Sequence, residues 1–126
     1  MRRVIRTEGA PVPIGPYSQS VAIASQLFTS GQIGVDPATG KLVDGGVESQ
    51  TRRTLENIKA IVEAAGGHLE DVVKVTIFLV DMQDFKAFNE VYAEYFPTPS
   101  PARTTVAVAA LPAGARIEID AVAAWD

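Results

Sequence analysis

The amino-acid sequence predicts a single α+β domain in which two helices pack on one face of a six-stranded mixed sheet. Two segments, residues 47–65 and 84–96, carry apolar side chains at the spacing of a helix face. Six shorter segments are rich in β-branched or alternating apolar residues, which is typical of strands. Their order is three strands, helix, strand, helix and two strands, which favours an α+β class. A chain of 126 residues, 47% of them hydrophobic, fits one domain over residues 1–126.

Three strands are expected before the first helix, at residues 2–6, 20–24 and 26–33. The second and third are separated only by Ser25, so a tight turn is expected between them. Residues 10–17 hold three prolines, each of which biases the preceding residue away from helix. This stretch is therefore expected to be extended or turned. Residues 36–41, Asp-Pro-Ala-Thr-Gly-Lys, have the composition of a turn.

Both helices have clear ends. The apolar face of the first comprises Val47, Thr51, Leu55, Ile58, Ile61, Val62 and Ala65. Gly66 and Gly67 end this helix, as glycine commonly does just past a helix C-terminus. The second helix begins at Asp84, and prolines at 97, 99 and 101 end it. Its inward face comprises Phe85, Phe88, Val91, Tyr92, Tyr95 and Phe96.

Three strands remain, at residues 71–80, 103–111 and 117–124. The first of these is β-branched and mostly apolar, which predicts a central strand buried on both faces. Two helices on one face of six strands leave the other face uncovered. The sequence therefore predicts that this face contacts the sheets of other subunits.

Composition removes several classes of chemistry. The chain has no cysteine and a single histidine, His68, which excludes disulfides, thiol nucleophiles, Cys-based metal sites and paired-histidine sites. Its 11 basic and 15 acidic residues give a net charge of −4, which argues against nucleic acid as the main partner. No apolar run is long enough to span a membrane, and the basic start at residues 1–8 lacks the apolar stretch of a signal peptide. A cytoplasmic protein that does not bind membranes is expected.

Four short segments carry residues that can do chemistry. Residues 15–19 present Tyr17 on a stiff turn, and residues 29–33 place Gly31 at a strand end. Arg103 opens an otherwise apolar strand, and Glu118 and Asp120 share one face of the last strand. Each also has an ordinary structural explanation. Tyr17 could simply pack, and Gly31 could form a bulge. Arg103 could make a surface ion pair, and Glu118 and Asp120 could lie on a solvent-exposed face.

Strand geometry limits how Arg103 and Glu118 can meet. A simple hairpin about residues 111–116 would place Arg103 opposite residue 124 and Glu118 opposite residue 109. Six residues of strand, roughly 20 Å, would then separate them. A shared site requires a different strand order or a neighbouring chain, and both remain open at this stage.

Taken together, the motifs resemble the RidA/YjgF family of enamine/imine deaminases. The resemblance rests on residues 15–19, 29–33, 57–66, 85–92, Pro101-Ala102-Arg103 and Ile117-Glu118-Ile119, in order and over nearly the whole chain. It implies a chorismate-mutase-like fold and a homotrimer with inward-facing sheets and ligand clefts between subunits. It also implies hydrolysis of short 2-imino acids to 2-oxo acids and ammonia. We expect no metal and no cofactor, because an imine is already an activated electrophile.

The same resemblance assigns residue roles. It implies that Arg103 binds the substrate carboxylate and that Glu118 positions or activates water. The other residues expected to bind substrate are Tyr17, Ser30, Gly31, Asn89 and, through its backbone N–H, Thr105. Two departures from the family pattern are Thr104 and Thr105, where cysteine or a small residue is common, and Asp120, where glutamate is common.

Two other functions compete with the deaminase. The first is a non-catalytic regulatory trimer that senses 2-oxo or amino acids through the Arg103 pocket. The second is ribonuclease activity or inhibition of translation. The net charge of −4 and the single histidine argue against this second alternative.

Overall fold

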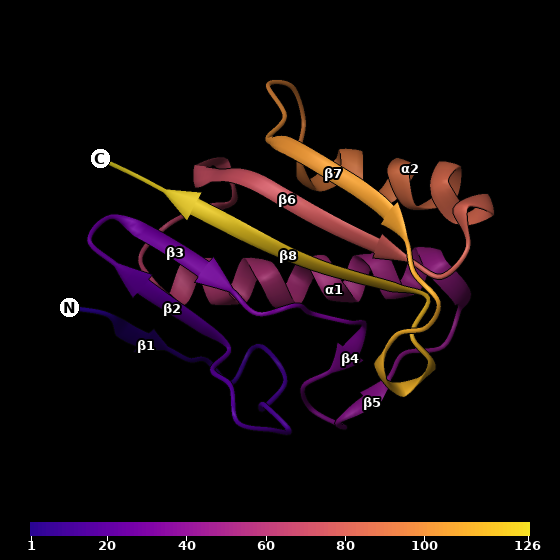
Figure 1. Ribbon diagram of the computed structural model, residues 1–126, viewed down its shortest axis with the longest axis horizontal. Helices are drawn as coiled ribbons and strands as arrows, with labels where there is room; N and C mark the ends of the chain where they lie inside the picture. Colours follow the sequence, from indigo (N-terminus) through magenta and orange to yellow (C-terminus); the bar gives the residue numbers. More distant parts are fainter.

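The structure is a computed structural model that describes residues 1–126, with one six-stranded sheet backed by two helices (Figure 1). The sheet comprises β1 (Arg3–Ile5), β2 (Ser20–Ile23), β3 (Gln26–Thr29), β6 (Val72–Leu79), β7 (Ala102–Ala107) and β8 (Ile117–Ala124). The helices are α1 (Gly46–Ala64) and α2 (Phe85–Tyr95). A separate two-stranded hairpin comprises β4 (Val35–Asp36) and β5 (Lys41–Leu42). Single 3₁₀ turns occupy Leu69–Asp71, Met82–Asp84 and Pro112–Gly114.

The strand order is β1-β2-β3-β8-β6-β7, so β6 lies between β7 and β8. The pair β6–β7 is parallel and is joined by α2, whereas every other pair in the sheet is antiparallel. A parallel pair needs such a crossover, because the chain must return to the starting end of the sheet. The hairpin between the last two strands therefore does not form. The strand order differs from the simple hairpin, but β6 separates the strands that carry Arg103 and Glu118, so this order alone does not bring the two residues together.

Both helices cover the same face of the sheet, as predicted. In Figure 1 they lie behind the strands, α1 across β8 and β3 and α2 beside β6 and β7. The core between them is apolar, with Leu55, Ile58, Ile77, Phe88 and Ile119 fully buried. No helix has both the length and the apolarity needed to cross a membrane.

The opposite face of the sheet, which we call the open face, has no helix over it. Along β8 the residues alternate strictly between buried and half-buried. On the open face Ile23, Phe28 and Val106 are 44%, 43% and 39% exposed. The prediction that β6 is buried on both faces is wrong for the single chain: Val75, Ile77 and Leu79 are buried, but the residues between them are not. The helices cover only one side of β6.

Two strands are shorter than predicted. The strand expected at 26–33 ends at Thr29, whose hydroxyl accepts the N–H of Ala121 in place of a carbonyl. The chain rejoins β8 at Gln32, which exchanges two backbone hydrogen bonds with Ile119. The strand expected at 103–111 ends at Ala107. The turn expected at 36–41 is present, and it joins the hairpin β4–β5, which the sequence did not reveal.

Candidate functional site

Arg103 lies on the helix side of β7, which is the edge strand of the sheet. Its position in register with buried Val75 turns the side chain toward α2. There Arg103 Nη1 donates to Asn89 Oδ1 at 2.7 Å. Its Cζ lies 4.9 Å from the ring centre of Tyr92 and 5.0 Å from that of Phe88. The guanidinium is thus half-buried against aromatic rings and one amide.

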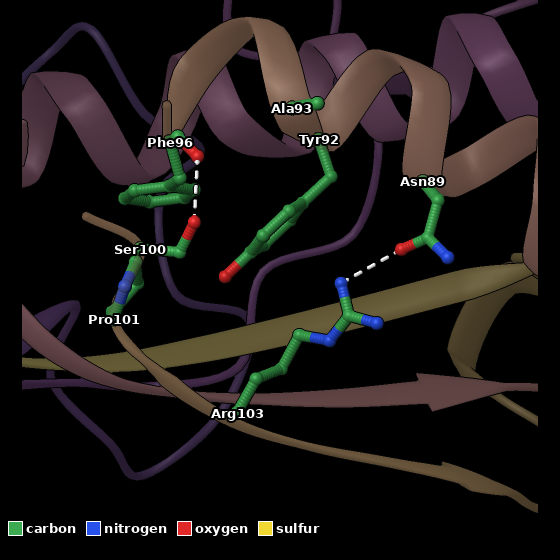
Figure 2. A pocket seen from close by; sticks show the side chains of 7 residues that line it. All are labelled: Asn89, Tyr92, Ala93, Phe96, Ser100, Pro101 and Arg103. Atoms are coloured by element: carbon green, nitrogen blue, oxygen red, sulfur yellow. Dashed lines mark hydrogen bonds between the residues drawn. The ribbon is translucent and has the colours of Figure 1, made fainter. Parts of the chain in front are cut away.

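No carboxylate of the chain pairs with this arginine. The two ion pairs of the protein are Arg52–Glu94 and Arg116–Asp84. Arg103 therefore keeps an uncompensated charge and free N–H donors, which favours binding of an anion from outside the chain. It borders a cavity of about 380 Å³ lined by Asn89, Tyr92, Ala93, Phe96, Ser100, Pro101 and Arg103 (Figure 2).

Two buried polar atoms without partners belong to Tyr92, which contacts Arg103, and to Thr105, two residues from Arg103 on β7. The Tyr92 hydroxyl and the Thr105 Oγ1 are the only buried side-chain polar atoms of the chain that lack a hydrogen bond. Burial raises the pKa of the Tyr92 hydroxyl, and the nearby charge of Arg103 opposes this shift. Unpartnered buried polar atoms are costly, so their concentration here marks a site that packing alone does not explain.

The backbone of β7 adds a donor. The N–H of Val108 donates to the Leu79 carbonyl on β6 at 2.8 Å. Because the N–H groups of a strand point alternately to its two sides, the N–H of Thr105 points away from β6 toward the free edge of the sheet. This edge position fits the expectation that the Thr105 N–H contacts a carboxylate.

Glu118 lies on the open face. It is in register with half-buried Phe78, and Asp120 follows it on the same face. Burial, and secondarily the charge of Asp120, raises the pKa of Glu118. Burial also raises the pKa of Asp120, with Lys74 and Thr76 opposing the shift. Glu118 and Asp120 are thus two neighbouring carboxyl groups, each with a raised pKa.

Gly31 lies directly against the Glu118 carboxylate. A Cβ at Gly31 would overlap the carboxylate of Glu118, so a side chain there would displace that carboxylate from its position. The bridge between Gln32 and Ile119 holds the two segments together. The sequence did not predict this contact between Gly31 and the Glu118 side chain.

Tyr17, in the 15–19 turn, and Ser30, next to Gly31, lie close to each other. The Ser30 hydroxyl donates to the Ser18 carbonyl, and the Ser30 N–H donates to the Gln19 carbonyl at 2.9 Å. Tyr17 is half-exposed, and its hydroxyl accepts the N–H of Ile14. Tyr17 borders one cavity with Ser30 and another with Gly31. Tyr17, Ser30 and Gly31 are thus neighbours, and Gly31 connects them to Glu118.

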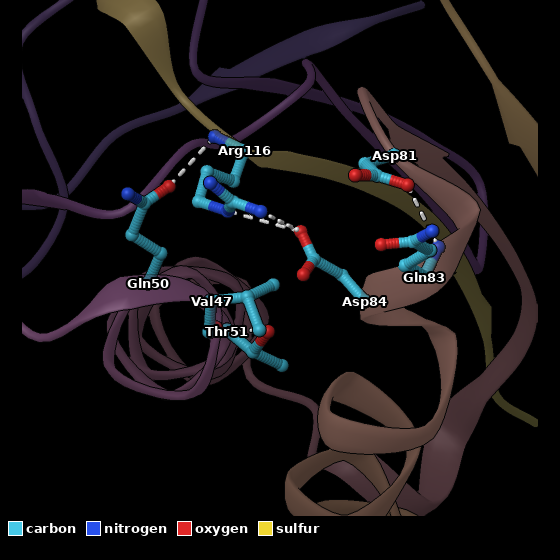
Figure 3. A network of polar contacts seen from close by, with 7 residues as sticks. All are labelled: Val47, Gln50, Thr51, Asp81, Gln83, Asp84 and Arg116. Carbon is cyan, nitrogen blue, oxygen red and sulfur yellow. Dashed lines mark hydrogen bonds and ion pairs between the residues drawn. The ribbon is translucent and has the colours of Figure 1, made fainter.

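A network at the start of β8 ties the sheet to both helices (Figure 3). Arg116 donates from Nε and Nη2 to Asp84 Oδ2 at 3.0 and 2.8 Å, at the start of α2. Its backbone N–H donates to Gln50 Oε1 of α1 at 2.8 Å. Glu118 is two residues further along, so the network holds the strand that carries it.

Comparison with known proteins identifies the family. The model of the family described as endoribonuclease L-PSP matches residues 7–125. The chain belongs to this family, known also as RidA/YjgF. It is 50% identical to the human 2-iminobutanoate/2-iminopropanoate deaminase over 123 residues, 98% of this chain and 90% of the human one.

Solved structures agree with this RidA/YjgF assignment. A candidate endoribonuclease of Thermotoga maritima matches with a TM-score of 0.97 at 52% identity, covering 100% of this chain and 99% of its own. TdcF of E. coli, solved with bound serine, matches with a TM-score of 0.93 at 45% identity, covering 98% of this chain and 99% of its own.

Within this RidA/YjgF chain the residues expected at the site lie in two separate groups, which we name the arginine half-site and the glutamate half-site. The arginine half-site contains Arg103, Asn89 and Thr105 on the helix side of β7. The glutamate half-site contains Glu118, Gly31, Ser30 and Tyr17 around the open face and the 15–19 turn. Sequence reasoning missed the contact of Arg103 with the rings of α2. The helical spacing of Phe85, Phe88 and Tyr92 was visible, but it indicated only a core face.

Proposed function

We propose that this protein hydrolyses short 2-imino acids to 2-oxo acids and ammonia. The observation that carries the proposal is Arg103, a half-buried cation with free donors and no carboxylate partner. A 2-imino acid has a carboxylate for such a cation and an electrophilic C=N beside it. Relatives support the reaction: one with 50% identity has the name of a 2-imino acid deaminase, and another was solved with the amino acid serine.

We propose further that the reaction site is composite, with the arginine half-site of one chain facing the glutamate half-site of a second. The open face carries exposed apolar side chains such as Ile23, Phe28 and Val106, which fits burial against other copies. Arg103 and the Thr105 N–H belong to β7, the edge strand of the sheet, so they lie where a second chain could reach them. A homotrimer with clefts between subunits accommodates both features.

The chemistry uses one fixed charge and one proton carrier. Arg103 binds the carboxylate of the imino acid. The water oxygen bonds to the imine carbon while Glu118 accepts one proton from this water, and the C=N electron pair moves to nitrogen, which receives that proton back from Glu118. The product of this step is a carbon that carries a hydroxyl and an amino group. Glu118 then accepts the hydroxyl proton and gives it to the amino group, the C–N bond breaks as the 2-oxo group forms, and ammonia departs. One water is consumed for each ammonia released.

A coupled assay tests this proposal. A dehydratase acting on threonine produces 2-iminobutanoate, which semicarbazide traps as a coloured or absorbing product. The protein is expected to suppress the trapped signal and to accelerate release of 2-oxobutanoate and ammonia. Arg103→Ala is expected to lose this effect, whereas Arg52→Ala, which removes an exposed arginine paired with Glu94, is expected to keep it. An unchanged trapped signal with the wild-type protein would overturn the deaminase.

Two alternatives give different results in the same setting. A regulatory trimer that only senses these acids would bind 2-oxobutanoate without lowering the trapped signal. A ribonuclease, the activity in the family's description, would cleave RNA instead. The net charge of −4 disfavours the ribonuclease, because RNA binding relies on a basic surface.

A further inference from the structure

The inward face of α2 is shaped around the guanidinium of Arg103. Counted from Phe85, three further residues of α2 follow at positions +3, +4 and +7, namely Phe88, Asn89 and Tyr92. Residues at this spacing project from one side of a helix. Neighbouring rings meet edge to face, at 81° for Phe85–Phe88 and 66° for Phe88–Tyr92. The side chain of Arg103 reaches from β7 toward this face of α2, where Figure 2 shows it beside Asn89 and Tyr92, and its Cζ also lies near the rings of Phe85 and Phe88.

All contacts from this surface to Arg103 are neutral. The Cζ lies within 5.6 Å of three ring centres, close enough for cation–π attraction from each. The hydrogen bond to Asn89 Oδ1 is to an amide, not a carboxylate. By contrast, Arg52 and Arg116 are held by Glu94 and Asp84, which neutralise them.

Neutral contacts leave the charge of Arg103 available to a ligand. A carboxylate in the place of Asn89 would hold the guanidinium equally well but would compete with an incoming anion. Cation–π attraction to a ring face requires no conventional hydrogen-bond acceptor. The only hydrogen bond made by the guanidinium is that of Nη1 to Asn89, so donors for a bidentate carboxylate remain available.

We propose that Phe85, Phe88, Asn89 and Tyr92 form a charge-neutral cradle that positions Arg103 for bidentate binding of a carboxylate. The ring of Tyr92 lies 4.9 Å from Cζ and its hydroxyl also lies near the guanidinium, so the contributions of ring and hydroxyl are tested separately. This inference rests on the proposed function, since it explains how the carboxylate of the imino acid is recognised. These four side chains are positioning residues.

The first experiment separates ring from hydroxyl. Titration of the intact oligomer with 2-oxobutanoate in a calorimeter gives Kd, and the trapping assay gives KM and kcat. Tyr92→Leu is expected to raise Kd and KM about tenfold, because it removes a partly desolvated cation–π contact. Tyr92→Phe, which keeps the ring, is expected to restore both. Tyr95→Leu is the matched control: its ring is on the same helix, but its hydroxyl donates to Glu56 on α1.

The second experiment tests neutrality. Asn89→Asp is nearly isosteric and gives Arg103 an ion-pair partner. If Asn89 only stabilised the structure, Asn89→Asp should bind 2-oxobutanoate as well as the wild type or better. If the neutral cradle matters, Asn89→Asp should raise the Kd for 2-oxobutanoate more than Asn89→Ala does. The proposal is overturned if Asn89→Asp binds like the wild type. It is equally overturned if Tyr92→Phe loses as much affinity as Tyr92→Leu.

A measurement without ligand distinguishes failure of the cradle from failure of the proposed function. The side-chain protons of Arg103 should be shifted upfield in NMR spectra by the ring currents, in the wild type and in Tyr92→Phe, and should return toward ordinary positions in Tyr92→Leu. If the wild type neither binds 2-oxobutanoate nor hydrolyses imines, the proposed function fails. If it does both and Tyr92→Leu matches it, only the cradle fails.

Discussion

Arg103 and Glu118 project from opposite faces of the same sheet. Arg103 stands in register with Val75, which faces the helices, and Glu118 stands in register with Phe78, which faces the open side. The two strands that carry them are separated by β6. No rotation of either side chain brings them together through the sheet. We therefore expect a reaction that needs both residues to take them from two different chains.

Mixing two inactive variants tests this directly. Arg103→Ala and Glu118→Gln are each expected to lose imine hydrolysis alone. When they are co-expressed, a site between chains is intact wherever a Glu118→Gln chain supplies the arginine and an Arg103→Ala chain supplies the glutamate. Random mixing makes about one quarter of such sites intact. The measurement is the specific activity of the co-expressed, differently tagged and co-purified oligomer. A site within one chain would give no recovery.

Gly31→Ala is expected to lose activity more than stability. Its new methyl group would overlap the carboxylate of Glu118, which is the end of a flexible side chain and would be displaced from its position. Gly15→Ala is the control, because a Cβ there would meet only the Tyr17 ring at 3.5 Å, an ordinary contact. The trapping assay and urea unfolding compare the two variants. Full activity in Gly31→Ala would show that the Glu118 carboxylate need not stay where it lies.

The pH dependence of hydrolysis should follow Glu118. The group must be ionised to accept a proton from water, and burial together with Asp120 raises its pKa above the ordinary 4.5. Activity is therefore expected to rise with pH through that elevated pKa. Asp120→Asn removes the smaller of the two causes, so the acidic limb of the kcat/KM profile should move to lower pH by a modest amount. A shift to higher pH would contradict this electrostatic assignment.

The same two carboxyls affect the stability of the free chain. Because the folded pKa of each is raised, the folded state binds protons more tightly than the unfolded state. Their contribution favours folding below the ordinary values of 3.8 and 4.5, and it is lost as the pH rises through the elevated folded values. The double variant Asp120→Asn with Glu118→Gln should therefore show a smaller fall in unfolding free energy across that window, measured by urea titration.

Gln19 holds the N-terminal segment against the glutamate half-site. Its side chain accepts from the Thr7 N–H at 2.7 Å and donates to the carbonyls of Thr7, Ala10 and Pro11. Gln19→Ala should cost about 2–3 kcal/mol, because it leaves buried backbone groups unpartnered. Proteolysis of the first ten residues should also become faster. Gln26→Ala, at an exposed position of β3, should change neither measurement.

Local sequence patterns were sufficient to predict most helices and strands, but not which strands pair with each other. β8 has the predicted bounds of 117–124, because strict alternation and the loop before it are both visible in the chain. The position of Arg103 was not predictable in the same way. Its face depends on the parallel register of β7 on β6 across α2, a relation between distant segments that no local period encodes. The Glu118–Gly31 contact likewise depends on the bridge between Gln32 and Ile119.

The open face gives the last prediction, on assembly. Phe28 lies on this face, in register with Val122 of β8, and is 43% exposed in the single chain. Phe28→Asp would place a charge where other copies are expected to bury an apolar surface, at a cost large enough to dissociate the oligomer. Light scattering should change from the mass of three 13.4 kDa chains to that of one, and imine hydrolysis should disappear with it. Met82→Asp is matched in exposure, at 45%, but lies in the turn before α2, and it should leave both mass and activity unchanged. A Phe28→Asp protein that stayed trimeric would place the interface elsewhere, whereas a monomer that kept full activity would contradict the composite site.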